Sequence, residues 1–334
     1  MATLGQTALT LADWGKRLDD GGKVAKIVEL LNAKNEIIDD MLWIEGNLPT
    51  GHKTTVRTGL PSATWRMLNY GVVPSKSRTA QVTDSCGMLE AYAEVDKALA
   101  DLNGNTDEFR LSEDKAFIEA MNQDFASTLF YGSTQTNPER FTGLTARYST
   151  SNNANAETAN NVLVGGSATN SVNTSVWLVV WGDTTMSGIF PKGSKAGLGV
   201  KDLGEHTLFD ANGGRYQGYR THFKWDCGFT LRDWRYAVRI CNIDVATLTK
   251  DASAGSDLID LMTQALEGVF DLTSGTPVFY VNRKIRSFLR RQIVNKTAHS
   301  TLSYDNVAGK RVMTFGEVPV RRVDALLNTE ALVS

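Results

Sequence analysis

Two aspartates, Asp226 and Asp233, are by residue type the best candidates in this chain for a catalytic acid pair. Two nearby carboxyl groups can divide the roles of general acid and general base between them. Both aspartates stand beside arginines, at Arg232, Arg235 and Arg239. Carboxylates in such company are more often structural ion pairs than catalytic groups. Catalysis by this pair is therefore the alternative interpretation and not the preferred one.

The other reactive residue types form no catalytic or metal-binding pattern. The four histidines lack the spacing of metal ligands, and no serine lies in a Gly-x-Ser-x-Gly motif. The three cysteines contain no CxxC pair, which favours a reducing compartment over a disulfide framework. The glycine-rich segment 182–217 has neither phosphate-binding fingerprint, and we interpret it as a long exposed loop or hairpin. We expect no enzymatic activity, no metal and no cofactor.

Composition is that of an ordinary folded protein made in the cytosol. The chain has 334 residues, 42% of them hydrophobic and 22% charged, with a formal net charge of −2. This length allows two domains or subdomains with their own cores. A near-neutral balance argues against a dedicated nucleic-acid binder. The N-terminus lacks the pattern of a signal peptide, and no apolar run approaches the ~18 residues of a membrane span.

The elements that would position the aspartates are two strands. From Gly218 to Leu231 apolar and polar residues alternate, which is typical of a strand with one buried face. The alternation changes phase at Arg232-Asp233, so that Trp234, Tyr236, Val238 and Ile240 then alternate with polar residues that include Arg239. A one-residue phase change requires a bulge or bend. We therefore predict two strand segments joined by a kink.

A basic ribbon is predicted over residues 46–83. The segment carries five basic residues and no acid, and its β-leaning pieces (54–58, 64–70 and 79–83) are separated by turn residues. It has too few hydrophobic residues for a core of its own, and an isolated two-stranded ribbon is marginally stable. Either it packs on its own subunit as a surface hairpin, or it is an arm that reaches a neighbouring subunit. The basic residues are Lys53, Arg57, Arg66, Lys76 and Arg78.

The following segment, 84–119, has the opposite charge, with ten acids against three basic residues. Ser112 is a candidate N-cap for a helix that extends to Tyr131 and ends at Gly132. A basic ribbon and an acidic helix offer complementary surfaces, which set register and choice of partner. The alternative is that both are solvated faces. The acidic contact candidates are Glu108, Glu113, Asp114 and Glu119.

The remaining periodicity predicts helices over 24–44, 256–270 (capped by Ser256) and 282–294. Buried strands are expected at 176–181 and 278–281, and a strand with an edge-like Pro319 at 312–323. The helix at 282–294 has a basic outer face that could meet phosphate, as nucleic-acid contacts do, or the acids of another subunit. Its members are Arg283, Lys284, Arg286, Arg290 and Arg291.

Four segments in the C-terminal two thirds carry a resemblance to a known family. They are ERFTGLTARY (139–148), HFKWDCGFTLRDWRYAVRICNID (222–244), TPVFYVNRKIRSFLRR (276–291) and RRVDALLNTEA (321–331). With these motifs in this order, the chain resembles the major capsid proteins of tailed bacteriophages, in particular short-tailed phages such as the Bordetella podophage. The resemblance implies the α+β Hong-Kong-97-like capsid fold, with a peripheral domain, an axial domain, an N-terminal arm and an extended β-ribbon loop, connected in an order that differs among relatives.

The resemblance also implies a division of the chain. The peripheral domain contains a long spine helix, here the helix from Ser112 to Tyr131, and the axial domain contains a mixed sheet. The divisions are 1–45 (arm and helix), 46–83 (extended loop), 84–150 (peripheral domain), 151–300 (axial domain) and 301–334 (a strand and tail that return to the peripheral domain).

The function implied is self-assembly into pentamers and hexamers of an icosahedral shell around phage double-stranded DNA. Expected partners are copies of the chain itself, a separate scaffolding protein (since no N-terminal extension is long enough to be a fused scaffold), a portal, non-specifically bound packaged DNA and, as a further candidate, a decoration or cementing protein. No membrane is expected. The protein would be made in the bacterial host cytoplasm and end in the virion capsid. The alternatives are a cytosolic α+β hydrolase or transferase that uses Asp226 or Asp233, and another virion component such as a tail or ring protein. The acid-free ribbon favours the shell.

Overall fold

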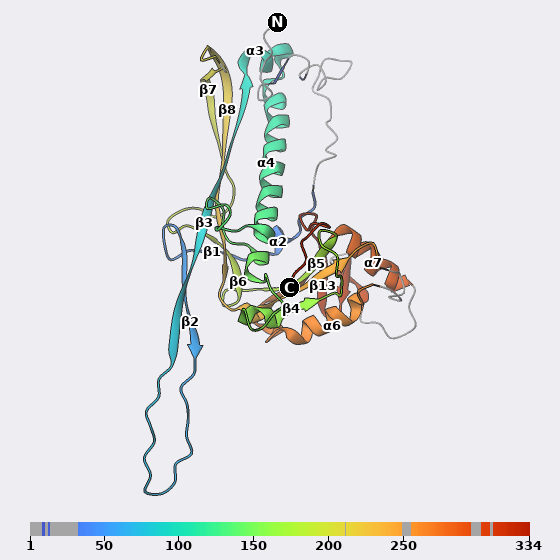
Figure 1. Cartoon of the computed structure of the whole chain (residues 1–334). Helices are drawn as coiled ribbons and strands as arrows, with labels where there is room; N and C mark the ends of the chain where they lie inside the picture. The colour runs from blue at the N-terminus through green and yellow to red at the C-terminus, as the bar shows by residue number, and fades with distance from the viewer. Residues whose placement is uncertain are drawn as a thin grey trace.

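The computed structural model describes residues 9–10, 13, 33–210, 212–248, 255–294, 302–307 and 310–334. A body of sheet and helices lies beside an elongated part that extends past it in two directions (Figure 1). Helix α4 (Thr106–Tyr131) runs away from the body next to the hairpin of β7 (Gly199–Phe209) and β8 (Arg215–Leu231). The hairpin of β2 (Gly51–Gly59) and β3 (Arg78–Asp96) projects in the opposite direction.

One mixed sheet connects both parts. Among the described residues it has 13 strands, and its main path runs in the order β11-β12-β13-β10-β5-β6-β8-β3-β2. Off this path, β1 pairs parallel with β6, β4 pairs parallel with β9, and β9 pairs antiparallel with β5. The remaining strands are β1 (Trp43–Glu45), β4 (Val162–Val164), β5 (Asn173–Trp181), β6 (Met186–Phe190), β9 (Ala237–Asp244), β10 (Thr276–Val281), β11 (Leu302–Val307), β12 (Lys310–Phe315) and β13 (Val318–Arg322). The remaining α-helices are α2 (Ile37–Asp40), α3 (Lys97–Ala100), α5 (Leu144–Arg147), α6 (Leu258–Gly268) and α7 (Arg283–Val294).

Strand β5 is the centre of the core. Successive side chains of a strand point to opposite faces, so its continuous apolar run requires cover on both sides. Trp177 and Val179 pack in the cluster that includes α4, whereas Leu178 and Val180 pack in a second cluster with α6 and α7. Every residue of β5 is buried. The predicted buried strand at 176–181 is confirmed, as are the strand at 278–281 and the helix at 282–294.

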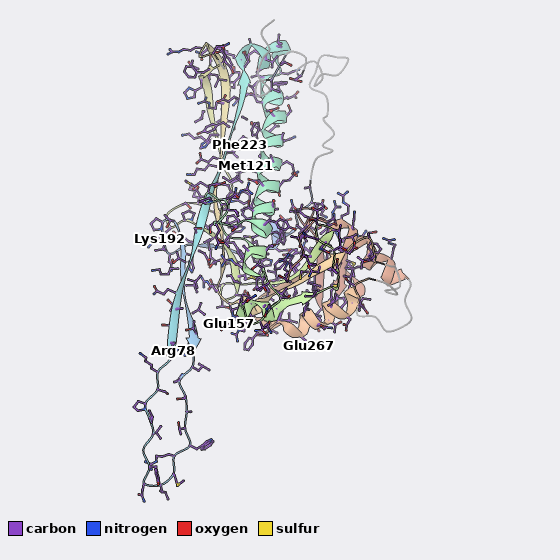
Figure 2. The ribbon with its side chains drawn as sticks, in the orientation of Figure 1. Arg78, Met121, Glu157, Lys192, Phe223 and Glu267 are labelled. Carbon is purple, nitrogen blue, oxygen red and sulfur yellow. The ribbon has the colours of Figure 1, made fainter. Side chains whose placement is uncertain are left out.

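Strand β8 connects the elongated part to the body. Its apolar face packs on α4, where Phe223 and Met121 lie close to one another (Figure 2). The predicted kink after Leu231 is confirmed, but its form differs from the expectation. Trp234 and Tyr236 lie in a 3-10 turn and not in a strand, because the Asp233 carboxylate accepts a hydrogen bond from the Arg235 backbone N–H. The chain then enters β9, which has different neighbours in the sheet.

Two predicted helix starts are wrong. Helix α4 begins at Thr106, and Ser112 is no N-cap because it lies within the helix, where its hydroxyl donates to the Phe109 carbonyl. Helix α6 is capped by Asp257, whose carboxylate accepts from two backbone N–H groups of the first turn, while the Ser256 hydroxyl donates to the Gly165 carbonyl. The predicted end of α4 at Gly132 is confirmed.

Other local predictions are corrected by strand pairing. Of the helix predicted at 24–44, residues 24–32 lie outside the described part, α2 is its only described helical piece, and β1 follows because Trp43 pairs with Gly188. No strand forms at 64–70, and β3 continues to Asp96 through its pairing with β8. Segment 182–217 contains buried β6 as well as the β7 hairpin. Pro319 is not at a sheet edge, since β13 lies between β10 and β12.

Candidate functional site

The connection between β2 and β3, residues 60–77, is the most exposed part of the described chain. Every residue from 60 to 83 is exposed. Figure 2 shows that the side chains beyond Arg78 reach no other element. We call residues 60–77 the tip. It carries seven large apolar side chains on its surface, and Trp65 is 101% exposed. They are Leu60, Trp65, Met67, Leu68, Tyr70, Val72 and Val73.

The root of the hairpin is held firmly to the body. Buried Asp84 accepts a hydrogen bond from Arg147 Nη2 (2.7 Å) and another from Thr230 Oγ1 (2.7 Å). Gly51 lies so close to this strand that an added Cβ would stand 2.0 Å from the Asp84 carbonyl oxygen. The root therefore has one fixed direction, while the tip has no support. Sequence analysis did not identify Asp84, because its partners lie more than sixty residues away.

The five basic residues predicted as contacts all lie on this hairpin. Lys53 and Arg57 are in β2, Arg66 and Lys76 are in the tip, and Arg78 begins β3. All five side chains are exposed, and none makes an ion pair with another residue of the described part. Residues 46–83, which contain no acid, therefore present an uncompensated positive charge.

Of the four acidic candidates, Glu108, Glu113 and Asp114 lie toward the start of α4 and Glu119 lies at its middle. The start of α4 points away from the tip (Figure 1). Glu108 is exposed, while Glu113, Asp114 and Glu119 are half-buried. One chain cannot bring these acids to its own tip, because the two lie at opposite ends of the elongated part.

Three of the acids, Glu113, Asp114 and Glu119, already interact with other groups of the chain. Glu119 Oε1 accepts hydrogen bonds from the Ala33 backbone N–H (2.8 Å) and from Gln123 Nε2 (2.7 Å). Partial burial raises the pKa of the Asp114 carboxyl, although the Thr221 hydroxyl acts in the opposite direction. Glu108 is consequently the candidate with the freest access to another molecule.

Helix α7 carries the predicted basic face. Arg283, Lys284, Arg290 and Arg291 are exposed and Arg286 is half-buried. The opposite side of the helix is buried through Ile285 and Leu289. A hollow of about 340 Å³ lies between this face and the turn that follows β9, and it is lined by Lys284, Ser287, Phe288 and Arg291 with Val245 and Ala246.

Asp226 and Asp233 do not form a pair. Asp226 lies in β8, where Lys224 Nζ is 3.3 Å from its Oδ2. Asp233 caps the 3-10 turn and holds Arg235, with Nη2 and Oδ2 2.6 Å apart. Partial burial raises the pKa of Asp233, but the hydrogen bonds from Arg235 outweigh it and hold that pKa below its usual value. Both carboxylates therefore have the structural roles expected beside basic residues.

A buried polar network that sequence analysis missed fastens the C-terminal segment. Arg239, expected on an exposed face, is buried because β9 is covered on both faces, and its Nη2 lies 2.9 Å from Glu330 Oε2. Tyr131, at the end of α4, donates to Glu330 Oε1 (2.6 Å), and Ser175 donates to Oε2. Burial, and then the Glu330 carboxylate, raise the pKa of Tyr131 well above its usual value. In the sequence, the signal for this network is Glu330, an acid within the motif at 321–331 that has no basic residue near it in the chain.

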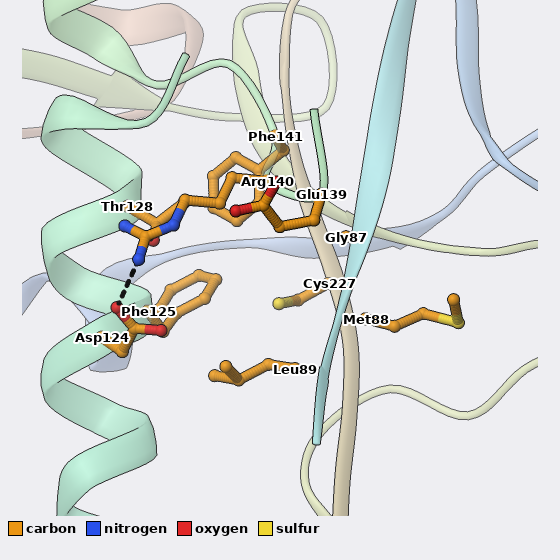
Figure 3. A pocket seen from close by; sticks show the side chains of 10 residues that line it. All are labelled: Gly87, Met88, Leu89, Asp124, Phe125, Thr128, Glu139, Arg140, Phe141 and Cys227. Carbon is orange, nitrogen blue, oxygen red and sulfur yellow. Dashed lines mark hydrogen bonds and ion pairs between the residues drawn. The ribbon is translucent and has the colours of Figure 1, made fainter. Parts of the chain in front are cut away.

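A cavity of about 170 Å³ opens between α4, the root of the β2–β3 hairpin and the loop that follows α4 (Figure 3). Its floor is apolar, made by Phe125, Phe141 and Leu89. At its rim Arg140 Nη2 lies 3.4 Å from Asp124 Oδ1. It is lined by Gly87, Met88, Leu89, Asp124, Phe125, Thr128, Glu139, Arg140, Phe141 and Cys227.

In the part of the chain that the structure describes, no helix combines the length and apolar character that crossing a membrane requires. In the same ranges, no three His, Cys, Asp or Glu side chains gather closely enough to hold a metal ion.

Comparison with known proteins gives a consistent result. The family model described as major capsid protein GP7 matches residues 19–334. A chain in the cryo-EM-derived structure of bacteriophage Epsilon15 is 37% identical, with a TM-score of 0.81, over 100% of this chain and 99% of that one. The capsid of bacteriophage JBD30 is 9% identical, with a TM-score of 0.50, over 89% of this chain and 93% of that one, and shows likeness of fold alone. No curated protein matches.

Proposed function

Since this chain belongs to the major capsid protein GP7 family and has the Hong-Kong-97-like fold, we propose that its copies assemble as pentamers and hexamers into an icosahedral shell around phage double-stranded DNA. Family membership makes it a structural protein of the virion. Family membership also favours the capsid role over the two alternatives, a hydrolase or transferase that uses Asp226 or Asp233 and a tail or ring protein.

The exposed tip is the observation that carries the assembly proposal. Soluble monomers rarely leave a large contiguous apolar surface uncovered, and such surfaces mark contacts with other molecules. The tip exposes seven large apolar side chains and projects away from the body, so its own chain does not cover them. We propose that a neighbouring copy in the shell covers these side chains. The firm root through Asp84 supports this, because it aims the tip in one direction.

Charge supports the same arrangement. Residues 46–83, which include β2, the tip and the start of β3, carry basic residues and no acid, and exposed Glu108 lies on α4. Contact between them therefore joins different copies. A contact between two different surfaces of the same protein is heterologous, and closes rings when its rotation divides a full turn. Complementary charge would set the register of this contact more than its strength.

The division of the chain remains part of the proposal. We assign 84–150 to a peripheral domain with α4 as spine helix, and 151–300 to an axial domain. The boundary at 83 falls within continuous β3, so the extended loop and the peripheral domain share one strand.

The packaged DNA and the remaining partners follow from the same role. The basic face of α7 suits phosphate contacts without sequence preference, because neutralising phosphates releases counterions. A separate scaffolding protein would guide assembly to a shell of defined size, and a portal would admit the DNA. A decoration or cementing protein on the outside would complete the particle, and synthesis would take place in the host cytoplasm.

Removal of the tip tests the proposal. The full chain and a variant in which Asn-Gly replaces residues 61–76 are expressed alongside the other virion proteins of the phage, then compared by size-exclusion chromatography and negative-stain microscopy. The full chain should form closed shells. The variant should melt at the same temperature but remain as small oligomers, because the tip reaches no other element of the described part of the chain. Shells from the variant would contradict the role of the tip, and a full chain without shells would contradict assembly itself.

A further inference from the structure

The geometry points to a specific socket for the tip: Trp65 of one copy inserts into the cavity between α4 and the hairpin root of a second copy. This inference rests on the proposed function and adds the identity of the two surfaces. It assigns a partner to a cavity that has aromatic side chains at its floor and that no described side chain of the same copy fills.

Trp65 has the properties of an interface anchor. It is fully exposed, whereas tryptophan normally buries a large area and finds a partner for its N–H group. Interfaces take most of their binding energy from a few such residues, and Trp is among the most frequent of them. The residues on either side are Thr64 and Arg66, so the indole is the large apolar group at this point of the tip.

The cavity has the size and chemistry to receive an aromatic ring. Its volume of about 170 Å³ compares with the ~150 Å³ of an apolar cavity that binds benzene. The rings of Phe125 and Phe141 lie 5.8 Å apart at an angle of 46°, and Phe125 also stacks on Trp225 with centroids 4.5 Å apart, so an inserted ring would join an existing aromatic cluster. Figure 3 shows Leu89 and Cys227 on the side opposite α4 and Met88 pointing away from the space.

The rim of the cavity matches the charge beside Trp65. Exposed Glu139 stands at the rim, and Asp124 on α4 forms an ion pair with Arg140, which lies between the two acids (Figure 3). These lining residues carry two negative charges and one positive charge. Arg66 follows Trp65 directly, so insertion of the ring would bring the guanidinium to the acidic rim, where a charge-assisted hydrogen bond to Glu139 can form.

The occupant must be a second copy. The cavity is lined by Gly87, Met88 and Leu89 of β3, the strand that leads out to the tip. From Gly87 to Arg78 this strand is extended, which at ~3.3 Å a residue places the start of the tip ~30 Å from the cavity of its own chain. Each copy therefore offers one ring and one socket, and such a contact propagates from copy to copy around a ring.

Site-specific photo-crosslinking tests the pairing. The aromatic photoreactive residue p-benzoylphenylalanine replaces Trp65 in the full-length chain, and Leu60 of the same tip in a matched control. Assembled material is illuminated, linked dimers are isolated, and the linked peptides are identified by mass spectrometry. From position 65 the links should fall on residues 87–89, 124–128 or 139–141 of a second copy. From position 60 they should fall elsewhere.

Each outcome separates this inference from the proposed function. Links from position 65 to other parts of a second copy would overturn the socket while leaving the tip as an assembly contact. The same cavity peptides from both positions would also overturn it, because the site would then lack selectivity for Trp65. Absence of linked dimers from assembled shells would overturn both the socket and the tip as an assembly contact, while shell formation itself would still stand. As a second measure, Trp65→Ala should raise the concentration needed for assembly roughly tenfold or more, and Trp65→Phe much less, without change in subunit melting temperature.

Discussion

Arg239 and Glu330 form a buried ion pair although 91 residues separate them in the sequence, with Nη2 and Oε2 2.9 Å apart. The pair joins β9 to the C-terminal segment, and Tyr131 extends it to the end of α4. Three parts of the fold therefore meet at one carboxylate. Helix α4, which this network fastens at its end, also forms one wall of the cavity beside the hairpin root.

Removal of one partner of this pair should destabilise the subunit strongly. Glu330→Gln leaves the buried Arg239 guanidinium without a counter-charge, and we expect a loss of ~3–5 kcal/mol in the free energy of unfolding. Urea denaturation of the unassembled subunit measures it. The double variant Arg239→Met/Glu330→Met should lose much less than Glu330→Gln, because no unpaired charge remains. Glu205→Gln, in the exposed pair with Lys97, is the control and should leave the free energy of unfolding almost unchanged.

Stability should fall as the pH falls below about 6.5, in part through His52. Burial, and then Arg232, whose Nη2 lies 3.1 Å from His52 Nε2, lower the pKa of this histidine in the folded chain, while Asp84 and Asp183 oppose the shift. The unfolded state then binds more protons than the folded state between the two pKa values, so stability is full above the unfolded pKa and is lost toward the folded one. The measurement is the melting temperature from pH 7.5 to 5.5. His52→Gln should show a shallower decline, and equal slopes would refute the assignment.

Charge reversal on the hairpin should impair assembly without unfolding. In the variant Arg57→Glu/Arg66→Glu both changed side chains are exposed, so the melting temperature should not change. The variant should form far fewer shells at physiological salt, as counted by electron microscopy, because it repels the acids of its neighbour. Lys192→Glu/Lys195→Glu makes the same change in net charge outside the hairpin and should assemble normally. Normal assembly of the Arg57/Arg66 variant would show that the charge pairing is wrong.

Gly188→Ala should destabilise the junction between the body and the elongated part. An added Cβ would stand 2.5 Å from Met41 Cε and 2.8 Å from Trp43 Cε3. Overpacking of this kind typically costs ~1–3 kcal/mol. The matched control is Gly268→Ala at the end of α6, where the nearest atom would be Val238 Cγ2 at 3.6 Å, and helix propensity favours the change. Thermal or urea unfolding should show a loss for the first variant and none for the second.

The sequence alone determined the elements that carry their own periodicity. Val176 to Trp181 is apolar without interruption, which predicts a strand covered on both faces. The apolar stripe before Gly132 and the glycine itself predict where helix α4 ends. The segment 46–83 has no acids and few hydrophobic residues, which predicts a ribbon without a core of its own. The four motifs indicated the family, because their combination and their order along the chain can be recognised without knowing any tertiary contact.

The tertiary structure decided what depends on partners distant in the chain. Strand β3 alternates polar residues with small ones at Ala91 and Ala93, a weak local signal that becomes a strand only through its pairing with β8. The sequence predicts an exposed Arg239, whereas in the folded chain Arg239 is buried and its charge is paired with that of Glu330. The cavity takes its walls from α4, β3, β8 and the segment around Phe141, and no local pattern records that they meet. Periodicity and capping act over a few residues, whereas burial of charge and the shape of a cavity are set by contacts across the whole chain.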